Sequence, residues 1–191
     1  MCSSDLRLFR VVKVVGKDAY VRWVDDQAIG TRSRADALRV LGVLQESLAD
    51  LYLTPNAKKS CVLSLPEAKL HFHLDTNAAL DLIESRIVKK SARRRTLVRD
   101  LSRVWRIALR NEGKGQWDQL QRRIYKVAGL VRARFLRHRA QRDLLANPSL
   151  AEKASDYVRC SGSAAEYLDF VKTVGSVDIL RERGDASSDT N

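Results

Sequence analysis

The sequence has little of what several common architectures depend on. Its three cysteines, Cys2, Cys61 and Cys160, are an odd number without Cys-x-x-Cys spacing, which argues against a disulfide framework or a zinc site. No run approaches the roughly 18 apolar residues of a membrane span. The N-terminus also has no apolar stretch that ends in a small-residue cleavage site. We therefore expect reduced thiols, a cytoplasmic location and no membrane partner.

Several catalytic motifs are missing as well. The sequence contains no P-loop, no Gly-rich dinucleotide fingerprint and no Ser-His-Asp order on which to build another enzyme. His71 and His73 could bind a metal ion as a pair, but no third ligand is near, so we expect surface or packing roles. Trp105 and Trp117 could stack on bases, but both lie on apolar stripes, so we expect them in the core.

Acidic residues are scarce beside basic ones. The chain has 35 Lys and Arg against 23 Asp and Glu, a net charge of +12. Residues 84–142 alone hold 19 basic and 4 acidic residues, whereas a solvated helix face normally mixes both signs. This pattern predicts a polyanionic partner such as nucleic acid. Because the guanidinium fork can bind two phosphate oxygens, we expect phosphate contacts from Arg93, Arg94, Arg95 and Arg99.

Short apolar segments and turn residues dominate the first 75 residues. Two of these segments flank Asp25-Asp26 and predict a hairpin, because a solvated turn tolerates the acidic pair better than mid-strand positions do. Ser33 is expected to cap a helix that continues to about residue 51. Residues 61–65 and 70–74, joined by 66–69, predict a second hairpin. The expected class is α+β.

From Asn77 onward the apolar residues recur at helical spacing. We expect Asn77 to cap one helix, and further helices over residues 95–111 and 116–137. Two more follow at 149–161 and 164–175, where Ser163 and Glu166 have the spacing of a capping box. The predicted organisation is therefore an α+β part at 1–75, a basic helical part at 76–183 and a disordered tail at 184–191.

The residues YVRWVDDQAIG, at 20–30, resemble the catalytic hairpin of reverse transcriptases, in which an aromatic residue and any one residue precede Asp-Asp. Trp23 stands at the aromatic position. The segment LYLTPNAKKS, at 51–60, is similar to the family's Leu-rich segment with Asn and Lys. The resemblance covers residues 8–75 and implies a partial polymerase palm of hairpin, helix and hairpin. The Arg-rich remainder is similar in style to the C-terminal helices of bacterial abortive-infection and defence-associated reverse transcriptases.

The resemblance implies metal-dependent nucleotidyl transfer with Mg²⁺ as the cofactor. Asp25 would ligate the metal directly, and Asp26 more weakly or through neighbouring contacts. Lys59, with Lys58 as the alternative, would lie near the phosphates of a dNTP. The partners implied are an RNA template and a DNA product.

The family also needs an Asp on an earlier palm strand, and fingers. Only 24 residues precede Asp25, and neither Asp5 nor Asp18 has the matching context. We therefore expect part of a longer, split or decayed RNA-directed DNA polymerase that is inactive alone. The alternative is a non-catalytic nucleic-acid-binding protein that uses its Arg-rich helices. A membrane-surface protein is a weaker third hypothesis, because the wide aromatic-rich apolar face is missing.

Overall fold

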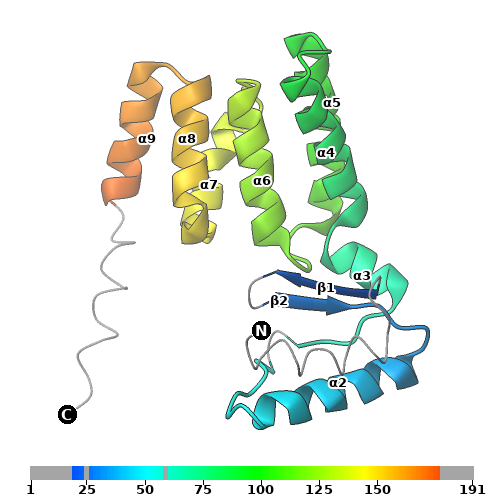
Figure 1. The fold of residues 1–191 in the computed structure, drawn as a ribbon. Coiled ribbons are helices and arrows are strands. Elements are labelled where there is room, and N and C mark those ends of the chain that lie inside the picture. The colour runs from blue at the N-terminus through cyan, green and yellow to red at the C-terminus, as the bar shows by residue number, and fades with distance from the viewer. Residues whose placement is uncertain (1–18, 24–25, 58–59, 177–191) are drawn as a thin grey trace, which may run out of the picture. The chain divides into compact units, whose positions relative to one another are not determined.

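The computed structural model describes residues 19–23, 26–57 and 60–176 (Figure 1). The chain divides into two compact units, Met1–Pro66 and Glu67–Asn191, which are described one at a time. The division falls at the start of helix α3 (Leu65–His71), whereas the sequence composition placed it after residue 75. The predicted disordered tail at 184–191 lies outside the described residues.

A short ribbon begins the described part of the first unit. Strand β1 (Tyr20–Trp23) pairs antiparallel with β2 (Asp26–Ile29), and the register runs from Tyr20 opposite Ile29 to Trp23 opposite Asp26. Beyond the last pair, the Gly30 amide donates a hydrogen bond to the Ala19 carbonyl at 2.7 Å. Residues 24 and 25 join the strands in sequence and lie outside the described residues.

Helix α2 (Arg34–Ala49) follows the ribbon and starts where the sequence predicted. The Ser33 hydroxyl oxygen accepts from the Asp36 amide at 3.1 Å, which satisfies one of the amides left without a helical partner at a helix start. The helix ends at Ala49, and Tyr52 then adopts a left-handed conformation with φ of 56°. The cap at Ser33 is thus confirmed.

The predicted α+β palm is wrong, and the second hairpin shows why. Residues 65–71 form helix α3, and the described residues around it, 60–64 and 72–73, contain no strand. Pro66 lies in the first helical turn, where its missing amide costs nothing, and Glu67 and Lys69 complement the helix dipole. These residues therefore favour a helix start over a hairpin turn. The ribbon is the only sheet among the described residues, and it pairs two strands rather than forming a palm.

The second unit is a stack of helices around one apolar core (Figure 1). Helix α6 lies between the α4–α5 pair and α8, and α9 packs on α8. None of the helices in the described residues has the length and apolar character needed to cross a membrane. The helical elements are α4 (Leu74–Val88), α5 (Arg94–Ala108), η2 (Leu109–Asn111), α6 (Trp117–Leu130), α7 (Arg137–Ala146), η3 (Pro148–Leu150), α8 (Ala151–Ser161) and α9 (Ala164–Ser176).

Two predicted helix boundaries are wrong. Helix α4 starts at Leu74, before the expected cap, and the Asn77 side chain donates instead to the Phe72 carbonyl at 2.8 Å. Helix α6 ends at Leu130 rather than near residue 137, because Arg132 is left-handed with φ of 49° and the chain turns there. The amphipathic pattern continues through this turn into α7, so periodicity alone merged two helices into one.

The core confirms the packing role expected of the tryptophans. Trp105 and Trp117 are buried, and their rings lie 5.9 Å apart. Tyr125 of α6 is fully buried, and its hydroxyl donates to Asp143 at 2.8 Å. Burial raises the pKa of Tyr125, so this hydroxyl keeps its proton and remains a donor.

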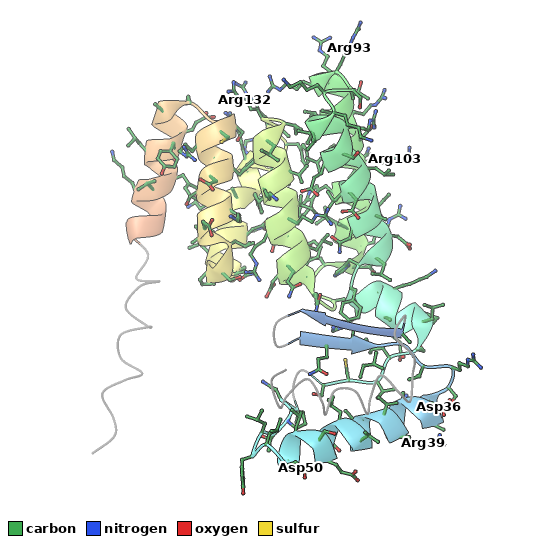
Figure 2. The ribbon with its side chains drawn as sticks, viewed as in Figure 1. Asp36, Arg39, Asp50, Arg93, Arg103 and Arg132 are labelled. Atoms are coloured by element: carbon green, nitrogen blue, oxygen red, sulfur yellow. The ribbon has the colours of Figure 1, made fainter. Side chains whose placement is uncertain are left out.

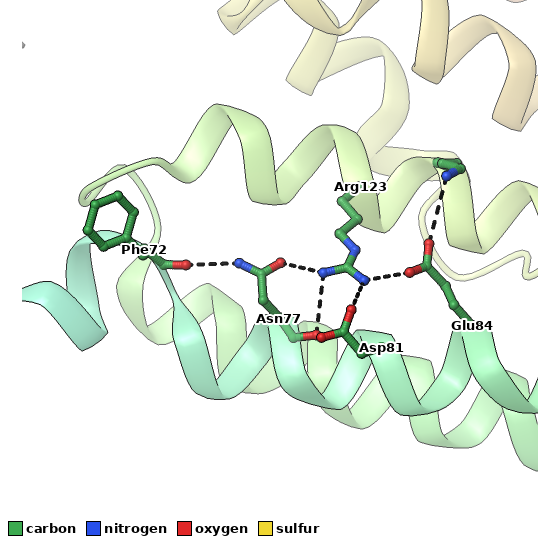
Figure 3. Close-up of polar contacts among 6 residues, drawn as sticks. Phe72, Asn77, Asp81, Glu84 and Arg123 are labelled. Carbon is green, nitrogen blue, oxygen red and sulfur yellow. Dashed lines mark hydrogen bonds and ion pairs between the residues drawn. The ribbon is translucent and has the colours of Figure 1, made fainter. Parts of the chain in front are cut away.

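Arg123 joins α6 to α4 through a group of polar contacts (Figure 3). Its guanidinium donates to the Asn77 side-chain oxygen at 2.9 Å, to Glu84 at 2.5 Å and also to Asp81. Lys126 approaches the other oxygen of Glu84 at 3.9 Å. One partly buried cation therefore bridges two carboxylates of α4 and ties two helices together.

The same multiplicity makes Arg123 hard to replace. We expect Arg123→Lys to lower the free energy of unfolding by about 1–2 kcal/mol, because an ammonium cannot hold three acceptors in this planar arrangement. Urea denaturation of the whole chain measures the loss. Arg122→Lys is the matched control, since the Arg122 side chain makes only a long hydrogen bond among the described residues, to the Asp118 carbonyl at 3.4 Å. Equal losses in both variants would show that the Arg123 contacts do not stabilise the fold.

The predicted capping box at the start of α9 is present and gives a pH dependence. Glu166 accepts from the Ser163 amide at 2.6 Å and from the Ser163 hydroxyl at 2.9 Å, and these bonds lower the pKa of Glu166 from its usual 4.5. A lowered folded-state pKa stabilises the fold above the ordinary value. That stabilisation is lost as the pH falls through the lower folded value.

We therefore expect Glu166→Gln to remove an acid-sensitive part of the stability. The variant should differ from the wild type at neutral pH, and the difference should shrink below pH 4.5. Thermal unfolding at stepped pH measures this, and carboxyl NMR titration of Ser163→Ala should find the pKa of Glu166 moved up toward its usual value. The amide of residue 163 still donates in this variant, so a Glu166 pKa unchanged in Ser163→Ala would contradict the contribution of the Ser163 hydroxyl.

Candidate nucleic-acid interface

Helix α5 places a row of arginines on its outer face. We call Arg95, Arg99, Arg103 and Arg106 the arginine stripe. They are spaced four, four and three residues apart, and all four are exposed. This spacing keeps them on one side of the helix, because 3.6 residues complete a turn. The buried residues of α5 lie on the opposite side and are Leu97, Leu101, Val104, Trp105 and Ala108.

The stripe has few internal partners. Arg99 lies 3.8 Å from Asp100 and is 79% exposed, so this ion pair is weak. Within the described part of the chain, no carboxylate is within ion-pair distance of Arg95, Arg103 or Arg106. Figure 2 shows Arg103 pointing away from the helices that pack on α5. The stripe therefore presents positive charge to whatever lies outside it.

The start of α5 adds further positive charge, although helix starts usually favour acidic residues. The segment 86–99 contains seven basic residues and no acidic one. Arg93, Arg94 and Arg95 stand at the first turn of α5, which has no acidic residue. The amides of a helix start already carry partial positive charge, so cations there are unfavourable without an anion nearby.

Arg94 differs from its neighbours because it has a structural task. Its side chain donates to the Val131 carbonyl at 2.9 Å and to the Arg132 carbonyl at 2.7 Å. These two carbonyls lie at the end of α6, where helical partners are missing. Arg94 thereby attaches the start of α5 to the end of α6, so of the four predicted contact residues it is the one that also holds the fold.

An open cavity lies where these helix ends meet, and we call it the end cavity. Its volume is about 390 Å³, within the range of small-molecule sites. Four cations contribute to its walls, and Figure 2 shows that Arg132 lies at the same end of the helical unit as Arg93. Its cations are Arg86, Lys90, Arg94 and Arg132, and its apolar residues are Ile87, Ala92, Leu97, Leu130 and Val131.

Two of these cations have an unusual backbone. Lys90 and Arg132 have φ of 51° and 49°, and each follows the end of a helix. In both places the next amide bonds back across the turn, from Ser91 to Arg86 at 3.1 Å and from Ala133 to Ala128 at 2.9 Å. This geometry favours glycine, and another residue costs about 1–2 kcal/mol.

Of the residues that the sequence predicted for catalysis and dNTP binding, the structure describes only Asp26. Asp25, Lys58 and Lys59 lie outside the described residues. The backbone of Asp26 begins β2, opposite Trp23. Among the residues that the structure describes, no three His, Cys, Asp or Glu side chains come together as a metal site. The Mg²⁺ assignment therefore stays a prediction for the connection between β1 and β2.

The histidine pair has the packing role that the sequence favoured. His71 ends α3 and His73 follows it, so the two do not share a strand face. His73 is buried, and its Nε2 donates to the Lys114 carbonyl at 2.8 Å. Beside it, Gly115 has φ of 55°, and a side chain there would collide with the His71 backbone.

The sequence did not predict correctly which basic side chains are available to bind a ligand. Arg123 and Arg137 belong to the basic residues of 84–142, but both are mostly buried in ion pairs, Arg137 with Glu166 at 2.5 Å. Arg103 was not among the predicted contact residues, although its spacing from Arg99 indicated the same helix face. Nothing in the sequence pattern marks Lys90 and Arg132 as neighbours in one cavity.

Comparisons with known proteins add no relative to this description. No family model, no curated protein and no solved structure matches the chain.

Proposed function

We propose that the helical unit binds nucleic acid through the arginine stripe of α5. The observation that carries the proposal is a continuous face of four exposed arginines whose charge is largely uncompensated within the described residues. Exposed cations without partners are available to neutralise phosphates and release counterions, and this supplies most sequence-independent affinity. A cytoplasmic location, as the sequence predicted, is compatible with such a partner.

The length of the stripe suits a chain of phosphates better than a single anion. Arg95 and Arg106 are eleven positions apart, which corresponds to about 16 Å along a helix. The phosphates of one strand in a duplex recur about every 3.4 Å along its axis. Several phosphates of one strand can therefore face the stripe together, and the guanidinium forks can bind them in pairs.

Removing the stripe should change the salt dependence of binding. We expect the variant with Arg95, Arg99, Arg103 and Arg106 all replaced by Gln to bind a 20-nucleotide single strand more weakly. The slope of log K against log salt should become shallower by about 3, since each lost phosphate contact removes about 0.7. Fluorescence anisotropy from low to moderate salt measures both quantities. Arg94 is left intact because it holds α6.

The matched control changes the same number of charges elsewhere. Arg142, Lys153, Arg159 and Lys172, all replaced by Gln, lie on α7, α8 and α9 and keep the net charge equal to that of the stripe variant. We expect this control to keep most of the wild-type slope. If both variants lose the same slope, binding depends on net charge alone and the stripe is not the site.

A second candidate concerns the ribbon, and the strand register favours it. Because Trp23 pairs with Asp26, only two residues join the strands, and one of them is Asp25. We propose that Asp25 and Asp26 bind Mg²⁺ there, as the resemblance to reverse transcriptases implies, with Lys58 or Lys59 serving a dNTP. Carboxylate oxygens are ligands that suit a hard cation. Polymerase activity itself would need a palm, which the described residues do not form.

Manganese can report on this second candidate. We expect Asp25→Asn to weaken Mn²⁺ binding by the whole chain at least about tenfold, measured as free Mn²⁺ by electron paramagnetic resonance. Asp50→Asn, at the end of α2, is the control and should bind as the wild type does. Equal affinity in the wild type and in Asp25→Asn would make the metal assignment wrong.

A further inference from the structure

We propose that the end cavity holds one nucleotide of a single strand, with its phosphate at Lys90 and Arg132 and its base against the apolar wall. The inference deepens the proposed function and rests on it, because the same strand would continue along the arginine stripe. It assigns a different task to each part. The stripe supplies sequence-independent affinity, and the cavity selects unpaired bases.

The four cations of the cavity fall into two pairs. Arg86 donates to Asp100 at 2.8 Å, and Arg94 donates to two carbonyls at the end of α6. Both are thereby fixed in place. The side chains of Lys90 and Arg132, in contrast, have no hydrogen-bond acceptor or ion-pair partner among the described residues. These two exposed cations remain available to a ligand in the cavity.

The backbone at the same two positions gives an independent reason. Lys90 and Arg132 are left-handed at helix ends where glycine would fit without strain. They belong to different helices, and their side chains nevertheless line one cavity. A lysine or arginine costs more stability than glycine at such a position. A cation at both positions is therefore expected where the charge serves binding.

The apolar wall explains why the ligand is a nucleotide rather than phosphate alone. Leu130 is 59% exposed at the end of α6, although it lies beside the core, and Ile87 and Leu97 extend the wall. A base can cover such an aliphatic surface with its flat face, and an apolar contact of this kind tolerates any base. A base in a duplex is covered by its neighbours, so the cavity suits an unpaired nucleotide.

The end cavity and the arginine stripe meet at the start of α5. Arg94 lines the cavity, and Arg95 is the next residue and the first member of the stripe. A strand whose phosphates follow α5 therefore reaches the cavity without leaving the basic surface. The cavity can accept a nucleotide at the end of the strand or one turned out of its path.

The test uses the whole chain with three small probes. Adenosine monophosphate supplies base and phosphate, inorganic phosphate supplies only the anion, and adenosine supplies only the base. We expect adenosine monophosphate to bind at least about tenfold more tightly than either, measured by calorimetry at low salt. Phosphate binding as tightly as the nucleotide would overturn the role of the apolar wall.

The decisive variant is Lys90→Gly together with Arg132→Gly. We expect it to unfold at the wild-type temperature or higher, because glycine relieves the left-handed backbone, and to lose at least about tenfold in affinity for adenosine monophosphate. Tyr52→Gly is the control, since Tyr52 has φ of 56° and lies outside the cavity. It should keep nucleotide binding. Leu130→Gln should weaken the binding of adenosine monophosphate and leave the binding of inorganic phosphate unchanged.

Oligonucleotides separate this inference from the proposed function. The wild type should prefer a single strand to a duplex of equal length, and the double glycine variant should lose that preference while keeping most of its salt slope. If the stripe variant loses its slope but the double glycine variant binds all probes as the wild type does, the cavity inference is wrong and the proposed function stands. If no oligonucleotide binds in a salt-dependent way, the proposed function fails and the cavity inference with it.

Discussion

The packing of α5 against α4 and α6 is the constraint on which the rest of the basic surface depends. Its apolar face, with Leu101 and Trp105, must be removed from water, and the core of the helical unit is where that happens. Burial of that face fixes the rotation of the helix. With this rotation, the arginines on the opposite side of α5 face outward as one row.

Cations in this unit divide according to what surrounds them. Arg123 and Arg139 lie between helices and are matched by carboxylates, with Glu112 at 2.5 Å from Arg139. Burial of these guanidinium groups without carboxylate partners would destabilise the fold strongly. Arg95 and Arg103 lie in water and need no partner to be tolerated. A large positive charge therefore says less about binding than its distribution between these two environments.

The helix ends illustrate a conflict between local preference and use. Glycine would be favoured at Lys90 and Arg132, and a carboxylate would be favoured in the first turn of α5, but the chain places cations in all these positions. Local rules are followed elsewhere, as at Ser33 and in the capping box of Glu166. Lys90, Arg132 and the first turn of α5 lie at one end of the helical unit, and such departures from local preference are expected at a functional surface.

Features that depend on residues close together in the chain could be predicted from the amino-acid sequence. These are the cap of α2, the capping box of α9, the core positions of the tryptophans and the one-sided charge of α5, all of which follow from spacings within two turns of helix. The helix at 65–71 is also encoded locally, by Pro66 in its first turn and by Glu67 and Lys69 at its two ends, so the prediction of a hairpin there was wrong.

Which cations come close to one another, and which form ion pairs, depends instead on the packing of separate helices. Arg94 and Val131 are 37 residues apart in sequence, and Arg123 and Asp81 are 42 apart, so no local pattern relates them. Their contact results from the burial of apolar faces on separate helices, which brings distant charges together without any signal in the spacing of those charges. The end cavity exists for the same reason.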